Sequence, residues 1–368
     1  MMQEIYNKYM NMALSLALKG TGKVSPNPRV GAVIIKNDEV VSTGWHQEFG
    51  GKHAERIAIE NAEGINLEGA ALIINLEPCS HFGKQPPCAP LLVEKMFGKV
   101  IVGIMDPNPL VHGEGLNLLQ HNGIEVVKGV LEDECRWINR FFVKYITEKK
   151  PYVILKTAQS LNGCIATATG ESKWITSEAS RKKVHEIRAE VDAVIIGRDT
   201  AIKDNPDLTV RHIDGRNPYR VVFDTRLNLP WHLKMLKDEF KERTIVCCSE
   251  EMPEYKIEQF KEMTGTKVLT VSENSEKRID VHHALTKLAE EFYISSVMVE
   301  GGAGIASSFL LSSEVDELRF FYAPKIILGG LCSFYDDKET EKLIDAPKFK
   351  IKSILKSGDD FEVICTRK

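Results

Sequence analysis

The stretches His53-Ala54-Glu55, Glu77-Pro78-Cys79 and Pro86-Pro87-Cys88 decide the fold of the first half of this 368-residue sequence. One imidazole and two thiolates are a common ligand set for catalytic zinc, because they leave the fourth coordination position open to water. Structural zinc sites tend to fill all four positions, and of the neighbouring residues only His81 is near enough to be considered as a fourth ligand. The sequence therefore predicts a catalytic zinc site with His53, Cys79 and Cys88 as ligands.

Glu55 lies two residues after His53, and side chains at that spacing do not share a helix face. They can converge only at a helix N-terminus, where the helix dipole also favours the negative charge of thiolate and hydroxide. Zinc lowers the pKa of bound water to about 7. We predict that Glu55, which is not a ligand, takes a proton from that water and delivers it to the ring nitrogen and the departing ammonia.

The order H-x-E, then P-C, then C is typical of nucleobase deaminases, which usually have C-x-x-C. Here eight residues separate Cys79 from Cys88, so the second half of the pattern departs from that spacing. The prolines around Cys88 favour the first turn of a helix, a setting that lowers the pKa of a thiol. Each residue alone would also fit an ordinary core histidine or cysteine, but their joint order favours the zinc site.

The bulk composition bounds the class of protein. Hydrophobic residues make up 43% of the chain, charged residues 27%, and the formal net charge is −4. This composition is globular, the length suits two domains, and the charge gives no basic field for a nucleic acid. The eight cysteines are scattered, unlike a disulfide framework. We find no signal-peptide pattern and no apolar run near the ~18–20 residues that span a bilayer, so we predict a cytoplasmic protein without membrane or nucleic-acid partners.

Hydrophobic periodicity predicts alternating strands and helices, and therefore an α/β protein with largely parallel sheets. In the first half we expect helices at 4–19, 54–62, 90–96, 115–121 and 132–145, with strands at 30–35, 39–42, 70–76, 99–104 and 124–128. In the second half we expect strands at 152–156, 193–196, 219–223, 244–248, 267–270, 296–300, 317–324 and 361–366, with helices at 177–190, 281–291 and from about 303. The charged, proline-ended segment 147–151 marks the boundary, which gives domains 1–146 and 151–368.

The second half contains Val299-Glu300-Gly301-Gly302-Ala303-Gly304 between a predicted strand and a predicted helix. Glycines there allow a backbone to approach a phosphate, and a helix N-terminus supplies N–H donors. A tight strand–helix connection explains the glycines equally well. The turn also lies near the end of its domain, unlike a Rossmann fingerprint, which opens one.

Further motifs resemble the bifunctional deaminase/reductase family of riboflavin biosynthesis over nearly the whole length. In the first half they are Pro26-Asn27-Pro28-Arg29-Val30-Gly31-Ala32-Val33, Gly44-Trp45-His46, Glu77-Pro78-Cys79-Ser80-His81 and Asp106-Pro107-Asn108-Pro109 with Gly113 and Gly115. In the second half they are Leu155-Lys156, Ser160-Leu161-Asn162-Gly163, Ser172-Lys173-Trp174-Ile175-Thr176, His185 to Arg188, Gly197 with Thr200, 204–211 and Glu300-Gly301-Gly302.

The resemblance implies a cytidine-deaminase-like three-layer domain followed by a dihydrofolate-reductase-like α/β domain, with one Zn²⁺ and NADPH as cofactors. It places the substrate of the first domain against Asn27, His46, His81 and Lys84. In the second domain it places NADPH against Ala158, Trp174, Thr200, Asp204, Gly302, Ala303, Gly304, Ile305, Ala306, Ser307 and Ser308. It places the second substrate against Lys156, Ser172, Arg188, Leu208, Arg211 and Glu300. Arginines suit a phosphate because they are permanently charged bidentate donors.

The chain departs from the family pattern at four positions. Phe49 stands where a small residue is usual, Phe82 where a polar one is frequent, Lys84 where arginine is usual and Asn162 where aspartate is usual. Lysine keeps the positive charge of arginine but loses its bidentate fork. Asn162 puts in doubt any role that needs a carboxylate at that position.

The implied activity is deamination of a diaminopyrimidinone ribosylamine phosphate, followed by NADPH-dependent reduction of its ribosyl group to ribityl. The family analogy alone also implies a homo-oligomer. Two other interpretations stay open at this point. One keeps the deaminase but makes it an editor of nucleic-acid bases, with the second half as a binding module. The other is a non-catalytic protein with a structural zinc bound by four protein ligands.

Overall fold

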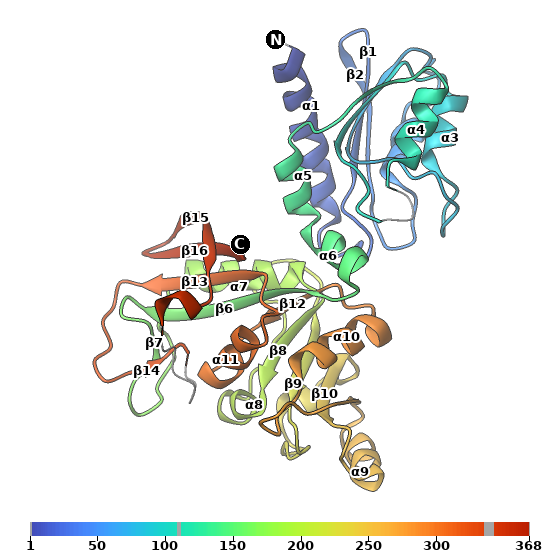
Figure 1. Ribbon diagram of the computed structural model, residues 1–368. Helices are drawn as coiled ribbons and strands as arrows, with labels where there is room; N and C mark the ends of the chain where they lie inside the picture. Colours follow the sequence, from blue (N-terminus) through green and yellow to red (C-terminus); the bar gives the residue numbers. More distant parts are fainter. Residues whose placement is uncertain (1, 109–111, 335–341, 368) are drawn as a thin grey trace. The chain divides into compact units, whose positions relative to one another are not determined.

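The computed structural model describes residues 2–108, 112–334 and 342–367 (Figure 1). The chain divides into two compact units, Met1–Lys149 and Lys150–Lys368, which we call unit 1 and unit 2. Pro109, at the end of one motif, lies outside the described residues. Within the described ranges, no helix combines the length and the apolar character that a bilayer crossing requires.

Unit 1 is a sheet with helices on both faces. Its elements are α1 (Met2–Ala17), β1 (Gly31–Lys36), β2 (Glu39–Trp45), α2 (Ala54–Asn61), β3 (Ala71–Leu76), α3 (Cys88–Glu94), β4 (Lys99–Ile104), α4 (Glu114–His121), β5 (Glu125–Val127), α5 (Glu132–Ile138) and α6 (Arg140–Glu148). In Figure 1, α1 and α5 lie along one side of this sheet and α3 and α4 along the other. The predicted three-layer domain is confirmed.

The strand order in unit 1 is β2-β1-β3-β4-β5. β1 is antiparallel to both β2 and β3, whereas β3, β4 and β5 run parallel. The sheet is therefore mixed, and the expectation of a largely parallel sheet holds only for its second half. Consecutive residues of β3, such as Leu72, Ile73 and Ile74, are all buried because helices cover both faces.

The predicted helix 132–145 is wrong as a single element, because α5 ends at Ile138 and α6 begins at Arg140. The residue between them, Asn139, is 2% exposed. Its Oδ1 accepts the backbone N–H of Arg29 at 2.8 Å, and its Nδ2 donates to the Arg29 carbonyl at 3.1 Å. The amide of Asn139 thus pairs with both backbone groups of a distant residue. The helix is interrupted at Asn139 to make these bonds, although the local sequence favours a continuous helix.

Unit 2 is built on a longer sheet. Its principal elements are β6 (Tyr152–Ser160), β7 (Cys164–Ala166), α7 (Glu178–Glu190), β8 (Ala193–Gly197), α8 (Arg198–Asp204), β9 (Tyr219–Phe223), β10 (Thr244–Ser249), α9 (Glu254–Thr264), β11 (Lys267–Val271), α10 (Val281–Phe292), β12 (Ser296–Val299), α11 (Ala303–Leu311), β13 (Glu317–Ala323), β14 (Leu331–Cys332), β15 (Phe349–Ser357) and β16 (Asp360–Arg367). The sequence did not indicate α8, α9, β7, β14 or β15.

The order of the large sheet is β11-β10-β9-β8-β12-β6-β13-β16-β15. The strands from β11 through β13 are parallel, and β16 and β15 add an antiparallel edge. Val153, Leu155 and Val299 belong to one core with Leu285 of α10 and Phe309 of α11. Because side chains alternate along a strand, the buried residues between them face the other side of the sheet.

The ends of three neighbouring parallel strands define the functional edge of unit 2. β8 ends at Gly197, β9 is followed by Asp224, and β12 is followed by Glu300. Parallel strands bring their carboxyl ends to one edge, which is where open α/β sheets bind ligands. Helices α8 and α11 begin at this same edge, so backbone N–H donors collect there.

Gly44 of β2 sets how closely α2 packs on the sheet in unit 1. A Cβ at Gly44 would lie 2.4 Å from the carbonyl oxygen of Ala54 and 2.5 Å from the nitrogen of Ala58, both backbone atoms of α2. We expect Gly44→Ala to destabilise unit 1 by about 1–3 kcal/mol, because a methyl group there must push the helix away. Denaturant unfolding followed by circular dichroism measures this.

Gly83→Ala is the matched control for this change. No atom lies within 4 Å of a Cβ at Gly83, so an alanine there meets open space. If Gly44→Ala unfolded at the same denaturant concentration as Gly83→Ala, close packing of α2 on β2 would not be a constraint on the fold.

Candidate functional site

The residues of the predicted zinc site meet at two helix N-termini in unit 1. His53 is the residue before α2, with an extended backbone, and Cys88 is the first residue of α3 after Pro87. Cys79 follows β3 by a short segment, and its carbonyl accepts the N–H groups of Cys88 at 3.1 Å and Ala89 at 3.0 Å. The N-terminus of α3 is thereby tied to the strand that delivers Cys79.

The three candidate ligand atoms lie within 4.8 Å of one another. The Nδ1 of His53 is 3.4 Å from the Sγ of Cys79 and 3.5 Å from the Sγ of Cys88. Zinc bonds of about 2.0–2.3 Å in a tetrahedron separate ligand atoms by about 3.5 Å. The donor set and its spacing therefore fit a zinc ion, and among the described residues this cluster contains three protein ligands.

The two cysteines of this cluster shift each other's pKa. The pKa of Cys79 is lowered to about 4, because Cys88 hydrogen-bonds to it and His53 stands beside it. The pKa of Cys88 is raised, because its thiol is held by Cys79 and is buried. Two adjacent thiolates repel each other unless a cation lies between them, so this pair is matched to a divalent metal.

Glu55 is 3% exposed and lines the same cavity as His53 and Cys79. Burial raises the pKa of its carboxyl group to about 7. Its place in the first turn of α2 puts it at the same helix end as His53, which agrees with the spacing argument. A buried carboxyl group beside a metal site is suited to carry protons.

The cavity in unit 1 has a volume of about 280 Å³ and is lined by all four residues predicted for the first substrate. Its lining includes Asn27, His46, His53, Glu55, Cys79, His81 and Lys84. The Nδ1–H of His46 donates to the Lys52 carbonyl at 2.9 Å, and the Nδ2 of Asn27 donates to the Nε2 of His46 at 3.2 Å. Burial lowers the pKa of His46, which keeps its ring neutral in this arrangement.

Two of the departures from the family pattern contact each other in this cavity. The Nζ of Lys84 lies 3.7 Å from the centre of the Phe49 ring, a cation–π contact. Gln85, next to Lys84, donates to the carbonyl of Gly50 at 2.9 Å. Phe82, the third departure, is 81% exposed. The aromatic ring at 49 therefore positions the lysine that replaces the usual arginine.

Sequence analysis missed the role of Glu77, which is 5% exposed at the end of β3. Its carboxylate accepts four backbone N–H groups, from Asp106 at 2.9 Å, Gly113 at 3.1 Å, Gly115 at 3.0 Å and Leu116 at 3.3 Å. The motif residues Gly113 and Gly115 were the signal in the sequence that could have pointed to this role of Glu77. A Cβ at Gly115 would lie 2.0 Å from the Pro78 carbonyl oxygen.

In unit 2, several of the predicted substrate residues meet around Glu300. Arg188 donates to both oxygens of Glu300, from Nε at 2.7 Å and from Nη2 at 3.0 Å, and the Nζ of Lys156 lies 3.8 Å away. Burial opposes the charge on Glu300, but Arg188 and Lys156 more than offset it and lower its pKa to about 2. Both arginines have a carboxylate partner, but Arg188 is largely buried against Glu300, whereas Arg211 pairs with Asp207 of its own loop and is half-exposed. Arg211 is therefore the more accessible anion contact.

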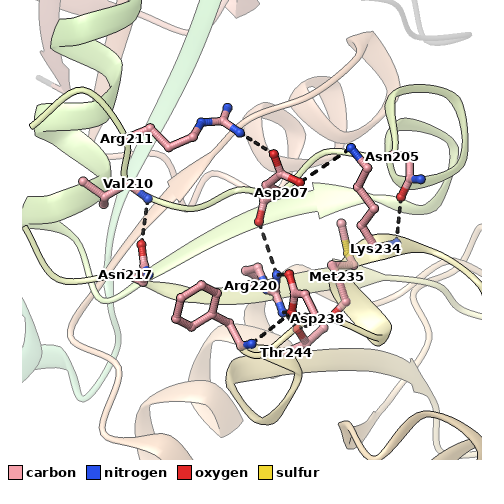
Figure 2. Close-up of polar contacts among 11 residues, drawn as sticks. Asn205, Asp207, Val210, Arg211, Asn217, Arg220, Lys234, Met235, Asp238 and Thr244 are labelled. Carbon is pink, nitrogen blue, oxygen red and sulfur yellow. Dashed lines mark hydrogen bonds and ion pairs between the residues drawn. The ribbon is translucent and has the colours of Figure 1, made fainter.

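The remaining substrate residues lie on two loops. Leu208 and Arg211 belong to residues 205–211, which follow α8. Figure 2 shows Arg211 with its neighbours. Leu208 is 3% exposed and has a φ of 54°. Ser172 lies in the segment before α7.

A second cavity, of about 430 Å³, lies at the carboxyl ends of β8, β9 and β12. Its lining includes five of the residues predicted for the dinucleotide: Thr200, Gly302, Gly304, Ile305 and Ser308. Ala303, Ala306 and Ser307 belong to the same helix, but Ala306 packs in the core. Ala158, Trp174 and Asp204 do not line this cavity in the described part of the chain. Trp174 is 65% exposed and stacks under Arg181.

The residues of this cavity fit a dinucleotide. Thr200 Oγ1 accepts the N–H of Gly302 at 3.2 Å, and a Cβ at Gly304 would have no atom within 4 Å. Asp224, 1% exposed, also lines the cavity, and in the described residues its Oδ1 has no hydrogen-bond partner. An unpartnered buried oxygen and a bare helix N-terminus both suit a bound ligand with donors and phosphates. The sequence analysis did not single out Asp224.

Comparisons with known proteins agree with both halves of this architecture. Residues 3–104 match the cytidine and deoxycytidylate deaminase zinc-binding region, and residues 151–363 match the RibD C-terminal domain. The riboflavin biosynthesis protein RibD of Aquifex aeolicus is 41% identical over 368 residues, which cover 100% of both chains. That of Actinobacillus pleuropneumoniae is 41% identical over 96% of this chain and 93% of its own.

Solved structures give the same result. RibD of Acinetobacter baumannii superposes with a TM-score of 0.88 at 34% identity, covering 100% of this chain and 99% of the other. The diaminohydroxyphosphoribosylaminopyrimidine deaminase/5-amino-6-(5-phosphoribosylamino)uracil reductase of Thermotoga maritima superposes with a TM-score of 0.86 at 39% identity, covering 100% of both chains.

The fold, the metal cluster and the two family matches together define a bifunctional enzyme, in which a zinc-binding deaminase domain precedes a reductase domain. The chain belongs to the RibD family of riboflavin biosynthesis proteins. The resemblance seen in the sequence is confirmed, as are the fold class and the enzyme class. The reductase domain of this family implies a nicotinamide cofactor.

Zinc binding should depend on Cys88. We expect Cys88→Ser to weaken zinc affinity by more than about 100-fold, because changes to residues that only support a metal ligand already cost 10–100-fold. Zinc content of the purified protein and competition with a chelator measure this. Cys135→Ser is the matched control, since Cys135 is a buried cysteine of the same unit whose thiol donates to the Val130 carbonyl. Equal zinc content in the two variants would exclude Cys88 as a ligand.

Proposed function

We propose that unit 1 deaminates a diaminopyrimidinone ribosylamine phosphate and that unit 2 then reduces the ribosyl group of the product to ribityl. The observation that carries this proposal is the buried carboxyl group of Glu55 beside the His53, Cys79 and Cys88 cluster in one cavity. The substrates come from the name of the Thermotoga maritima relative, a deaminase and a 5-amino-6-(5-phosphoribosylamino)uracil reductase.

In the deamination, water adds to the ring carbon that bears the amino group, and that amino group leaves as ammonia. His53, Cys79 and Cys88 would hold the zinc ion, which supplies the Lewis acidity that makes water a nucleophile at neutral pH. A carboxylate oxygen of Glu55 takes a proton from the attacking water. Glu55 gives that proton to the ring nitrogen, then takes the remaining proton of the added hydroxyl group and gives it to the departing nitrogen, so it is regenerated in each cycle.

The substrate of unit 1 would lie in the cavity of about 280 Å³. Asn27, His46 and His81 supply hydrogen-bonding groups for the pyrimidinone, and Asn27 is oriented by its bond to His46. Lys84 supplies positive charge for the phosphate. The lysine gives a point charge instead of a bidentate fork, and its contact with Phe49 restricts where that charge can lie.

In the reduction, the bond between C1′ and the ring oxygen breaks first, which gives an imine and turns the ring oxygen into a hydroxyl group. Hydride then adds to C1′ and a proton adds to the imine nitrogen. The cofactor supplies the hydride, and the protein supplies orientation. We place the substrate against Lys156, Ser172, Arg188, Leu208, Arg211 and Glu300, with Arg211 facing its phosphate. Burial lowers the pKa of Lys156, so this ammonium group is well suited to give up a proton.

We propose NADPH as the nicotinamide cofactor of unit 2. Thr200, Gly302, Gly304, Ile305 and Ser308 line the cavity that would receive it. The same helix, α11, also contains Ala303, Ala306 and Ser307. Parts of the cofactor outside the cavity would contact Ala158, Trp174 and Asp204. Arg198, Arg226 and Arg278 also line the cavity, and their charges suit the additional phosphate of NADPH.

The other interpretations of the sequence have less support. A structural zinc would need a fourth protein ligand, whereas the cluster in the described residues offers three. A nucleic-acid editor would need a binding module in the second half, but residues 151–363 match a reductase domain. The cytoplasmic location and the homo-oligomer stay predictions from sequence and family.

Deamination should require the carboxylate of Glu55. We expect Glu55→Gln to lower the rate of ammonia release by about 10²–10⁴-fold, because the amide keeps the volume but cannot take a proton. Zinc content should not change. Ammonia release and NADPH oxidation are followed separately, the latter with the deaminated intermediate supplied.

Glu60→Gln is the control, since Glu60 lies on the same helix, where it pairs with Lys52 at the surface. Ammonia release by Glu55→Gln at the rate of Glu60→Gln would exclude Glu55 as the proton carrier. Ammonia release without NADPH oxidation in the parent protein would leave the deaminase proposal intact and overturn the reductase proposal.

Dinucleotide binding should be blocked by a large side chain at Gly304. We expect Gly304→Leu to raise the Kd for NADPH by about 10-fold or more, since the cavity there is open. Gly304→Ala is the control, because alanine favours the helix and fills little of the cavity. Fluorescence titration with NADPH, and in parallel with NADH, measures both. Equal affinity for NADPH and NADH would contradict the choice of NADPH.

A further inference from the structure

Residues 205–211 carry Leu208 and Arg211, yet their backbone receives little support from regular structure. The loop follows α8, and within it Asn205 and Leu208 have φ values of 39° and 54°. A left-handed conformation is unfavourable for a residue that has a side chain. The surrounding structure must therefore hold this loop in its shape.

Side chains from outside the loop form hydrogen bonds to its backbone, and Figure 2 shows those of Asn217 and Arg220. The N–H of Val210 donates to the Oδ1 of Asn217 at 2.8 Å. The carbonyl of Asp207 accepts from the Nη1 of Arg220 at 3.3 Å. The N–H of Arg211 donates to the Nδ1 of His185 at 3.0 Å. Three backbone groups of the loop are thus bonded to three side chains.

Arg220 anchors one end of this arrangement. It is 1% exposed on β9, and both of its terminal nitrogens donate to the carboxylate of Asp238, at 2.5 and 2.8 Å (Figure 2). Its Nη2 also donates to the Met235 carbonyl at 2.8 Å. The loop itself bonds to the same region, because the Oδ1 of Asn205 accepts the N–H of Lys234 at 2.9 Å.

His185 anchors the other end, where the exposed cation Arg211 begins. It belongs to α7, one turn before Arg188, and is 5% exposed. Burial and the nearby charges of Arg188 and Arg211 lower its pKa to about 4. The ring is therefore neutral at physiological pH, and its Nδ1 is free of a proton and can accept the Arg211 N–H.

We propose that His185 is a positioning residue for the second substrate. By accepting a hydrogen bond from the backbone N–H of Arg211, His185 fixes where Arg211 lies. Arg220 and Asn217 fix the earlier part of the same loop. This inference rests on the proposed reductase function, since it assigns Arg211 to the substrate phosphate. His185 touches neither substrate nor cofactor in this assignment and acts only through the loop.

The test compares His185→Leu with His185→Asn in the full-length protein. Leucine fills the space but accepts no hydrogen bond, whereas the Oδ1 of asparagine can lie where Nδ1 of the histidine lies. We expect His185→Leu to raise the KM for the deaminated substrate about 10-fold, because leucine removes the partner of the Arg211 N–H and so no longer holds Arg211 in place. Asparagine should restore the KM to within about 2-fold. The Kd for NADPH and the rate of ammonia release should not change in either variant.

Two further measurements distinguish a loss of the position of Arg211 from a general loss of the folded structure. Amide hydrogen exchange of residues 205–211 should be faster in His185→Leu than in the parent and in His185→Asn, whether or not the enzyme turns over. Arg211→Gln should raise the KM by itself, and adding His185→Leu should then cost little more, because the two residues act as one unit.

Unchanged exchange of residues 205–211 in His185→Leu would overturn the inference without reference to activity. So would an unchanged KM in an active enzyme, or a loss of NADPH affinity and ammonia release together with the KM effect. A parent protein that binds NADPH but never oxidises it would instead overturn the proposed function, and the exchange measurement would still decide the role of His185.

Discussion

The buried carboxylate of Glu77 holds unit 1 together at the point where its chemistry takes place. Four N–H groups, from the loop after β4 and from the start of α4, donate to this one side chain. A carboxylate surrounded by N–H donors is well compensated for its burial, and it fixes every segment that supplies a donor. Cys79 lies two residues further along the chain. The position of this thiol is therefore set by a residue that is not a ligand.

The same constraint explains the motif glycines. Gly115 passes so close to the Pro78 carbonyl that a side chain would collide with it, and Gly113 has a φ of 82°. Both residues donate to Glu77 only because the backbone can come this near. The two glycines therefore occur in the motif because the backbone must surround the carboxylate of Glu77 at these positions.

Much of the fold and of the zinc cluster could be predicted from the sequence, because both depend on local patterns. His53 and Glu55 can meet only at a helix end, and the prolines before Cys88 start a helix. Contacts between residues far apart in the chain could not be predicted from such local patterns. Asn139 interrupts a helix because its side chain bonds to the distant Arg29. In β15, apolar residues such as Ile351 and Ile354 are exposed and do not keep to the alternation of apolar and polar residues that would predict a strand. The bond from the N–H of Arg211 to His185 and the place of Asp224 in the cavity wall likewise exist only in the folded chain.

Asn162 shows how a departure from a family pattern can follow from its neighbours. Its Oδ1 accepts from the hydroxyl of Ser160 at 2.7 Å and from the N–H of Ile327 at 3.1 Å. Its Nδ2 donates to the Ile327 carbonyl at 2.9 Å, a bond that an aspartate could not make. An ionised carboxylate would instead place negative charge against that carbonyl oxygen. The amide thus pairs with both backbone groups of Ile327, so in this chain the side chain at 162 joins two loops of the reductase domain.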